Sequence, residues 1–387
     1  MRRVQEVKRN IAAVDALLEQ VEPRAILMQS DIGRVTKVLA AGAGMRGIPM
    51  LLVPAVASMI TSRDILNGVT IESADSGNRF RCKSARAPLL NRIIAYLWPK
   101  VTFEHNGEKY LNTNAMQIII EKMLRVYPDS PWHLGGAKGS YIAVGSATDW
   151  KRYLGYGIEQ DRLILTGQVV HDRIFQARQG KKEKRSSRSP LILYGASPLP
   201  ESNHISWELH RRIMKSVIDH LRAVPCDLRF CLHPHFDPGP YLEFAREVGI
   251  TVEPRPLIKV LPDADAYLTW YSSTMPWAVM LDIPVINLDI YDMIDLKFTA
   301  TSDSIDYTSI GGVMNIKTLG EMVSVLKQAL YDELFRKDLA RRREEYVREN
   351  AILDGKAGER LVSVVEDMIA GRNPQLAGRL PVRFANV

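Results

Sequence analysis

Short apolar runs alternate along the chain with longer segments in which apolar residues recur every three to four positions. A short apolar run is typical of a buried strand, whereas the longer spacing is typical of one face of a helix. Eight runs predict strands, which lie at residues 25–29, 50–53, 141–144, 163–165, 191–194, 228–232, 266–270 and 285–288. Strands that alternate with helices predict α/β units, each built on a largely parallel sheet.

Two segments carry clear helix signals. Residues 206–222 place six apolar side chains on one stripe at helical spacing, namely Leu209, Ile213, Met214, Val217, Ile218 and Leu221. Thr318 and Glu321 form a capping box that predicts the start of another helix. The chain opens with the helix-like residues 4–21, although an α/β domain usually begins with a strand. Two explanations stay open: the first domain is reduced, or its start lies upstream of this sequence.

A polar stretch rich in Lys, Arg and Ser, which ends at Pro190, separates two groups of predicted strands. We expect five parts along the chain, which are a Rossmann-like first domain at 1–177, a basic linker at 178–190, a second Rossmann-like domain at 191–352, a closing helix at 353–370 and a tail at 371–387. The basic loop from Lys181 to Arg188 has two interpretations, a solvated linker or a patch that contacts lipid headgroups.

Composition narrows the classes of protein. The chain has 387 residues, enough for two domains, and its 46% hydrophobic and 25% charged residues exclude disorder throughout. A net charge of +7 suits an anionic ligand or membrane headgroups, but it lacks the dense basic composition of a dedicated nucleic-acid binder. Three cysteines, Cys82, Cys226 and Cys231, are too few for a disulfide framework and favour a reducing cytoplasm. No apolar stretch is long enough to span a bilayer, so we expect any membrane contact to be peripheral.

Polar residues follow the predicted strands of the second half, at the edge where an open parallel sheet binds its ligands. The candidates in three successive loops are Gly195 and Ser197, then His233 and Pro234, then Ser272, Ser273 and Thr274. Pro276 stands where a first-turn proline belongs, so the hydroxyl residues form a helix N-terminus whose free N–H groups suit a phosphate. Ordinary N-capping is the alternative for the hydroxyls, and a structural role is the alternative for the histidine.

The order of these motifs resembles the GT-B fold glycosyltransferases. A His-Pro pair followed by a serine cluster is similar to the motifs that hold CMP in bacterial sialyltransferases and capsule Kdo transferases, and cytidine diphosphate in CDP-glycerol polymer transferases. Residues 156–172 (YGIEQDRLILTGQVVHD) and 353–362 (LDGKAGERLV) also resemble segments of UDP-N-acetylglucosamine 2-epimerases. The similar segments cover about residues 160–362, and the first 150 residues match only weakly, around residues 21–31 (VEPRAILMQSD).

The resemblance implies two Rossmann-like domains that face each other across a cleft, and a metal-independent glycosyltransferase without a cofactor. The donor would be a nucleotide-sugar of the CMP, CDP or UDP type, and no nucleic-acid partner is expected. The acceptor would be a glycan or a lipid-linked molecule in the synthesis of a surface polysaccharide such as a capsule. The implied location is the cytoplasm, with peripheral contact at the inner face of the membrane.

Two alternatives to the transferase stay open. One is a sugar-nucleotide 2-epimerase or hydrolase of the same fold, and the other is a non-catalytic sugar-nucleotide-binding protein. Residues 51–58 (LLVPAVAS) count against the epimerase, because they lack the ionisable groups that it would carry there. No metal site is visible, because Asp263 and Asp265 precede a predicted strand and are typical of a turn.

Sugar transfer needs a base that deprotonates the acceptor hydroxyl. Asp31 and His133 are the candidates in the first half: Asp31 follows the first predicted strand, and His133 lies in a glycine-rich segment before the strand at 141–144. Helix capping is the alternative role for Asp31, and a structural loop role is the alternative for His133. Glu104 and His105 are weaker candidates.

Overall fold

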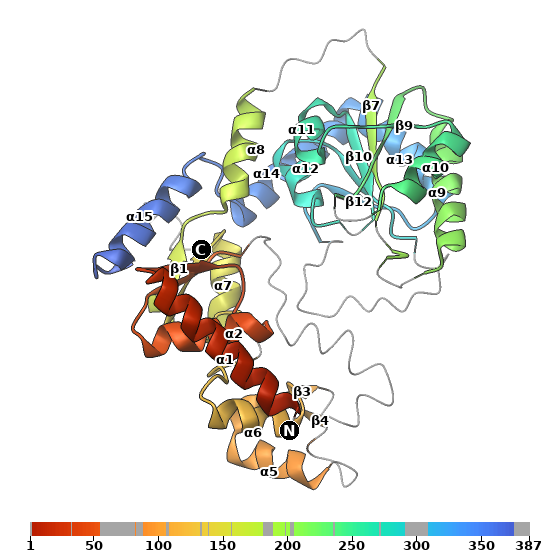
Figure 1. Ribbon diagram of the computed structural model, residues 1–387. Coiled ribbons are helices and arrows are strands. Elements are labelled where there is room, and N and C mark those ends of the chain that lie inside the picture. The colour runs from red at the N-terminus through yellow and green to blue at the C-terminus, as the bar shows by residue number, and fades with distance from the viewer. Residues whose placement is uncertain are drawn as a thin grey trace. The chain divides into compact units, whose positions relative to one another are not determined.

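The structure is a computed structural model that divides into two compact units (Figure 1). Unit 1 comprises Met1–Gln168, Thr299–Ile305 and Lys356–Val387, and unit 2 comprises Val169–Phe298 and Asp306–Gly355. The residues that the structure describes are 2–31, 33–54, 82, 88–105, 108–131, 134–137, 139–155, 157–180, 189–197, 199–201, 205–234, 237–270, 272–290 and 309–374.

Unit 1 is built on a four-stranded sheet in which each neighbouring pair is parallel. Its strands, in spatial order, are β1 (Ile26–Met28), β2 (Met50–Leu52), β5 (Ser140–Val144) and β6 (Leu163–Leu165). They coincide with the four strands predicted in the first half. Leu51, Leu52 and Ile142 are fully buried, which is typical of parallel strands that are covered on both faces.

Helices from both ends of the chain pack in unit 1. They are α1 (Arg2–Val21), α2 (Arg34–Met45), α7 (Ala147–Gly155) and α15 (Ala357–Ile369), with the short 3-10 turn η2 (Gln160–Arg162). In α15, Val364 and Met368 are buried against Leu51, Ala143 and Ile164 of the sheet. This helix therefore belongs to the core of unit 1, although it follows the whole of unit 2 in sequence.

A smaller group of elements in unit 1 has a core of its own. It contains α5 (Leu89–Leu97), the 3-10 turn η1 (Pro99–Val101), the antiparallel strands β3 (Thr102–His105) and β4 (Glu108–Leu111), and α6 (Ala115–Met123). Ile94 of α5 packs with Val101, Leu111 and Ile118. The predicted strands do not include β3 and β4, because these short strands contain charged residues and no continuous apolar run.

Unit 2 contains a six-stranded sheet in which every neighbouring pair is parallel. Its strands, in spatial order, are β12 (Val313–Asn315), β11 (Val285–Asn287), β10 (Ala266–Thr269), β7 (Leu191–Gly195), β8 (Asp227–Cys231) and β9 (Thr251–Val252). The chain begins in the middle at β7, builds outward to β9, and then returns to place β10 on the other side of β7. This is the strand order of a Rossmann fold, and β7 and β10 flank its topological switch point.

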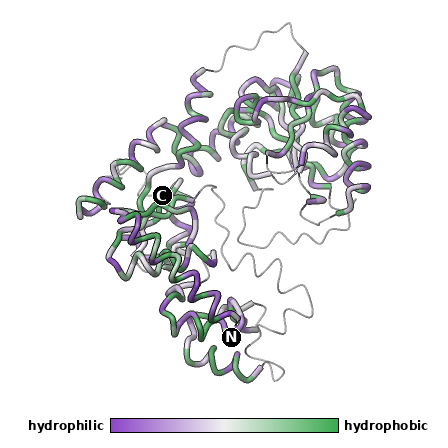
Figure 2. Tube along the Cα trace, viewed as in Figure 1, coloured by the Kyte–Doolittle hydropathy of each residue, from purple (hydrophilic) through white to green (hydrophobic). Residues whose placement is uncertain are grey.

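The helices of unit 2 include one that buries the apolar stripe predicted from the sequence at 206–222. They are α8 (Val169–Gln179), α9 (Trp207–Leu221), α10 (Gly239–Val248), α11 (Leu257–Val260), α12 (Met275–Met280), α13 (Leu319–Tyr331) and α14 (Glu333–Asn350), with the 3-10 turn η3 (Leu261–Asp263). Met214 and Val217 of α9 are fully buried in the core. Figure 2 shows the alternation of hydrophilic and hydrophobic positions along these helices. The predicted cap of α13 is confirmed, because the Thr318 hydroxyl accepts the N–H of Glu321 (3.4 Å).

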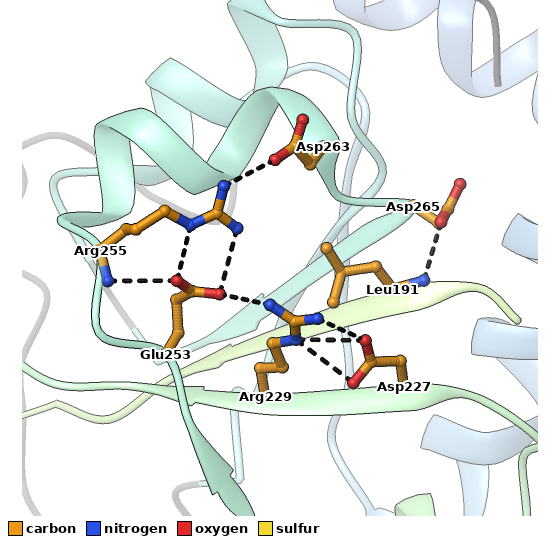
Figure 3. Close-up of polar contacts among 7 residues, drawn as sticks. All are labelled: Leu191, Asp227, Arg229, Glu253, Arg255, Asp263 and Asp265. Carbon is orange, nitrogen blue, oxygen red and sulfur yellow. Dashed lines mark hydrogen bonds and ion pairs between the residues drawn. The ribbon is translucent and has the colours of Figure 1, made fainter. Parts of the chain in front are cut away.

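Five charged side chains form a network beside β8 and β9 (Figure 3). The almost completely buried carboxylate of Glu253 accepts hydrogen bonds from Arg229 (2.8 Å) and from Arg255 (2.8 Å). Arg229 also pairs with Asp227, and Arg255 also pairs with Asp263. A buried carboxylate is costly unless charged donors surround it, and the two guanidinium groups supply those donors.

The network makes the stability of the protein depend on pH. Hydrogen bonds from Arg255, together with those from Arg229, lower the pKa of Glu253 from 4.5 to about 2, although burial acts in the opposite direction. The stabilisation is therefore fully present above pH 4.5, and it is lost as the pH falls toward 2 and the carboxylate is protonated. We expect Glu253→Gln to lower the urea midpoint of unfolding at neutral pH, and we expect this difference to shrink below pH 4.5.

Glu247→Gln is the matched control, because Glu247 pairs with Arg211 at an exposed position. Exposed pairs contribute little to stability, so the midpoint of this variant should stay close to that of the natural sequence at every pH. A deficit in Glu253→Gln that stayed constant from neutral pH down to about pH 3 would contradict the linkage.

Candidate nucleotide-binding site

The carboxyl ends of β7 and β10 meet at the switch point of the unit 2 sheet. In an open α/β sheet this is where a ligand-binding crevice forms, because the chain connections leave toward opposite faces there. β7 ends at Gly195, which pairs in register with Thr269 at the end of β10. The loops that contain Ser197 and Ser272 therefore begin side by side.

Direct hydrogen bonds join the two loops. The Ser197 hydroxyl donates to the carbonyl of Trp270 (2.6 Å), and the Thr269 hydroxyl donates to the carbonyl of Gly195 (3.1 Å). Thr269 is buried and Ser197 is partly buried, so water competes weakly with these bonds. The two loops are thus held as one unit at the edge of the sheet.

Three hydroxyl groups form a chain at the start of α12. The hydroxyl oxygens of Tyr267 and Thr274 lie 2.8 Å apart, and those of Thr274 and Ser272 lie 2.7 Å apart. Burial raises the pKa of Tyr267, so its phenol stays protonated at neutral pH and can donate. The Thr274 hydroxyl makes no capping bond to α12, so ordinary N-capping does not explain this residue.

Gly195 is required by the position of Tyr267. A Cβ atom at Gly195 would lie 2.6 Å from the Tyr267 hydroxyl oxygen, which is closer than a Cβ atom comes to a heavy atom that is not bonded to it. Sequence reasoning missed Tyr267, because it lies inside a buried strand and meets Gly195 only through the pairing of β10 with β7. The sequence did contain one sign of its role, which is a tyrosine inside a predicted buried strand. A buried phenol usually needs a hydrogen-bond partner.

His233 and Pro234 lie in the loop that follows β8, and both are exposed. This strand is the other neighbour of β7, and the N–H of Ala196 donates to the carbonyl of Cys231 (3.3 Å). The His233 loop therefore leaves the sheet beside the Gly195 loop. All three predicted loops therefore start at one edge of one sheet. The roles of His233 and of the exposed Ser273 in binding stay predictions.

A further polar group lies at the ends of β11 and β12, and its members are not among the predicted site residues. Asn287 donates to Asn315 (2.9 Å), and Lys317 forms an ion pair with the buried Asp289. The Lys317 side chain is 66% exposed, so it brings a cation to the edge where the strands end. Asp289 follows the predicted strand at 285–288, whereas sequence reasoning missed Asn315 and Lys317 because β12 was not predicted.

Asp31 of unit 1 lies after β1 but does not face solvent. Its exposed fraction is 1%, and its two carboxylate oxygens accept the backbone N–H groups of Gly135 (2.9 Å) and Ala137 (2.8 Å). Arg162 holds the same loop through carbonyl groups that include those of Ala137 and Ser140 (both 2.9 Å). This is the geometry of a loop anchor, whereas a general base must reach the proton that it removes. The helix-capping alternative does not apply either, because the N-cap of α2 is Gly33.

The other candidates of the first half lie outside what the structure describes. His133 and the loop from Lys181 to Arg188 are not among the described residues, and neither are the side chains of Glu104 and His105. The predictions for these residues stand on the sequence alone.

Within the described ranges, no three His, Cys, Asp or Glu side chains gather in a way that could hold a metal ion. Asp263 and Asp265 have structural partners: Asp263 pairs with Arg255, and Asp265 accepts the N–H of Leu191 (2.8 Å) at the start of β7. What the described site offers chemically is therefore a set of hydroxyl and backbone donors, with one exposed lysine at the same edge of the sheet.

No protein-family model matches the chain, and no curated protein matches it in sequence. Among solved structures, the UDP-N-acetylglucosamine 2-epimerase of Neisseria meningitidis bound to UDP-GlcNAc aligns with a TM-score of 0.50 at 15% identity, over 95% of this chain and 82% of that one. A Listeria monocytogenes protein described as a UDP-N-acetylglucosamine 2-epimerase aligns with a TM-score of 0.51 at 12% identity, over 93% of this chain and 78% of that one. The wall teichoic acid polymerase TagF, variant H548A, aligns with a TM-score of 0.42 at 11% identity, over 60% of this chain and 58% of that one.

At such identities the similarity shows a shared fold. Together with the two parallel sheets, it confirms the predicted fold class and the resemblance on which that prediction rested. None of the helices in the described ranges is long and apolar enough to cross a membrane. The chain is an α/β protein with two Rossmann-like units of the GT-B type.

Proposed function

We propose that this protein is a glycosyltransferase that moves a sugar from a nucleotide-activated donor to a glycan or lipid-linked acceptor. The observation that carries the proposal is the joining of the Ser197 and Ser272 loops at the switch point of a Rossmann-type sheet. Such a point is where this class of sheet binds nucleotides. The bonds between the loops fix the positions of the two loops before any ligand arrives.

Each part of the site has a role in this proposal. The hydroxyls of Ser272, Ser273 and Thr274 donate to the phosphate of the donor, and His233 adds a hydrogen bond from the neighbouring loop. These donors stabilise the negative charge that develops on the phosphate as the sugar leaves, which is the main task of catalysis in such a step. Lys317 contributes a positive charge at the same edge of the sheet, and we propose that the reaction proceeds without a metal ion.

Binding of free nucleotides tests whether the protein has a nucleotide site at all. In a thermal-shift screen with CMP, CDP, UDP and GDP, we expect one of the pyrimidine nucleotides to raise the unfolding temperature. Incubation of the matching nucleotide-sugars with glycan acceptors then tests the reaction. Transfer requires an acceptor, whereas nucleotide binding without any product would indicate the non-catalytic alternative.

Replacing His233 by alanine should weaken binding of that nucleotide about tenfold or more, because a hydrogen bond to a charged phosphate contributes about 1.5–3 kcal/mol. Isothermal titration calorimetry measures the effect directly. His220→Ala is the matched control, because His220 is an exposed histidine of α9 whose ring bonds to the carbonyl of Ser216. Unchanged affinity in His233→Ala, with the fold intact, would remove His233 from the site.

A 2-epimerase is the second candidate, and the fold comparison favours it. The Listeria and Neisseria structures, which align with TM-scores of 0.51 and 0.50, are both described as UDP-N-acetylglucosamine 2-epimerases. Against it stands the sequence at 51–58, which has no ionisable residue to move a proton at the sugar. Epimerisation would invert the configuration at C2 of the sugar of UDP-N-acetylglucosamine without any acceptor, and this outcome would replace the transferase proposal.

A further inference from the structure

The exposed face of α5 is apolar, which is the reverse of what a surface helix normally shows. Five large apolar side chains are exposed on it, namely Leu89 (69%), Leu90 (36%), Ile93 (44%), Tyr96 (87%) and Leu97 (56%). Figure 2 shows α5 drawn largely in the hydrophobic colour. Five such side chains reach roughly the 300–600 Å² of the largest apolar patches on monomeric proteins, and patches of this size often mark interaction sites.

Helix geometry gathers these five side chains on one side. At about 100° per residue they fall within an arc of about 120°, so they form a continuous stripe. The other side of the helix attaches it to unit 1, because Asn91 and Ile94 are buried and Ile94 belongs to the core shared with α6. α5 therefore has one apolar face for its own core and a second that no described residue covers.

The charged residues of α5 and of η1, the turn that follows it, are basic. Arg92 borders the stripe on α5, Lys100 follows in η1, and both are exposed, whereas neither element contains an acidic residue. Lys122 of α6 lies over the Trp98 ring at 5.1 Å from its centre. A cavity of about 830 Å³ begins at the end of α5. Its lining includes the basic residues Lys100, Lys122 and Arg162 and the acidic residues Asp129 and Glu159.

We propose that the α5 face docks on an anionic lipid bilayer. Its apolar side chains enter the boundary between headgroups and acyl chains, as those of interfacial amphipathic helices do. Arg92 and Lys100 contact the lipid phosphates, to which the negative surface potential of the bilayer attracts them. Tyr96 fits this position, because tyrosine is enriched at the level of the headgroups. The docking does not depend on the proposed reaction, so its test needs no enzymatic activity.

Cosedimentation with vesicles tests the docking. We expect the protein to bind vesicles of phosphatidylcholine mixed with phosphatidylglycerol at least about tenfold more tightly than vesicles of phosphatidylcholine alone, and less tightly at high salt. Leu89→Ser with Ile93→Ser should weaken binding to both kinds of vesicle about tenfold or more. Arg92→Glu with Lys100→Glu should abolish the preference for the anionic vesicles.

Leu334→Ser is the matched control, because Leu334 of α14 in unit 2 is a comparably exposed leucine (79%) and should not affect vesicle binding. Thermal unfolding of the α5 variants should match that of the natural sequence, because the replaced side chains are exposed. Three results would overturn the proposal. The first is that the natural sequence binds no vesicles. The second is a lower unfolding temperature in Leu89→Ser with Ile93→Ser, which would mean that the face packs within the protein. The third is self-association that this variant abolishes, which would identify a second copy of the chain as the partner.

Discussion

Replacing Asp31 by alanine should lower the free energy of unfolding by about 2–4 kcal/mol, the cost expected when two buried N–H groups lose a charged acceptor. The donors are the backbone N–H groups of Gly135 and Ala137, which lead into β5 and have Asp31 as their partner. Arg162 would still hold the carbonyl groups of this loop, so the loss should be partial rather than complete. Urea unfolding followed by circular dichroism measures the change.

Asp31→Asn distinguishes two roles of Asp31, which are the loop anchor seen in the structure and the catalytic base suggested by the sequence. Asparagine keeps one acceptor oxygen but places an NH₂ group against the second N–H. If Asp31 is an anchor, the protein should therefore again lose stability. A base would lose about 10²–10⁴ in rate on this change and little stability. The exposed Asp161 provides the control, because Asp161→Ala should leave both quantities near those of the natural sequence. Full stability together with lost turnover in Asp31→Asn would restore Asp31 as the base.

The largest effect on activity is expected from His133→Ala, which should reduce turnover about 10²–10⁴-fold, the usual contribution of a general base. Histidine titrates near neutrality, so it can take the proton of an acceptor hydroxyl without strong tuning by its surroundings. With Asp31 held as an anchor, His133 is the stronger of the two candidates for this role. Single-turnover kinetics with a nucleotide-sugar and its acceptor measure the change.

Nucleotide affinity should stay within about twofold in His133→Ala, because the proposed donor site consists of unit 2 residues and a lost base acts on rate rather than on donor binding. Rate loss with unchanged affinity is therefore the pattern that supports the assignment. If His133→Ala keeps its turnover, the base is another residue. The argument for the donor site would survive that result, because it rests on the loops at the ends of β7 and β10.

The sequence by itself determined the class of fold. Short, mainly apolar runs such as 191–194 and 266–270 are typical of strands covered on both faces, and their alternation with helix-like segments predicts parallel sheets between helices. It also placed Gly195, Ser197 and the Ser272 loop at strand ends, because the carboxyl end of a strand can be read from where its apolar run stops. These features depend on neighbours in sequence, and local patterns report them directly.

Only the tertiary structure decided which groups meet. The pairing of β10 with β7, between residues about 75 positions apart, brings the Tyr267 phenol against Gly195 and the Ser197 hydroxyl to the Trp270 carbonyl. Asp31 became an anchor through a loop more than 100 residues away, and α15 joined the sheet of unit 1 from beyond unit 2. A hydrogen-bond partner or a packing face is set by strand order and loop path, and no local pattern of hydrophobic and polar residues encodes these.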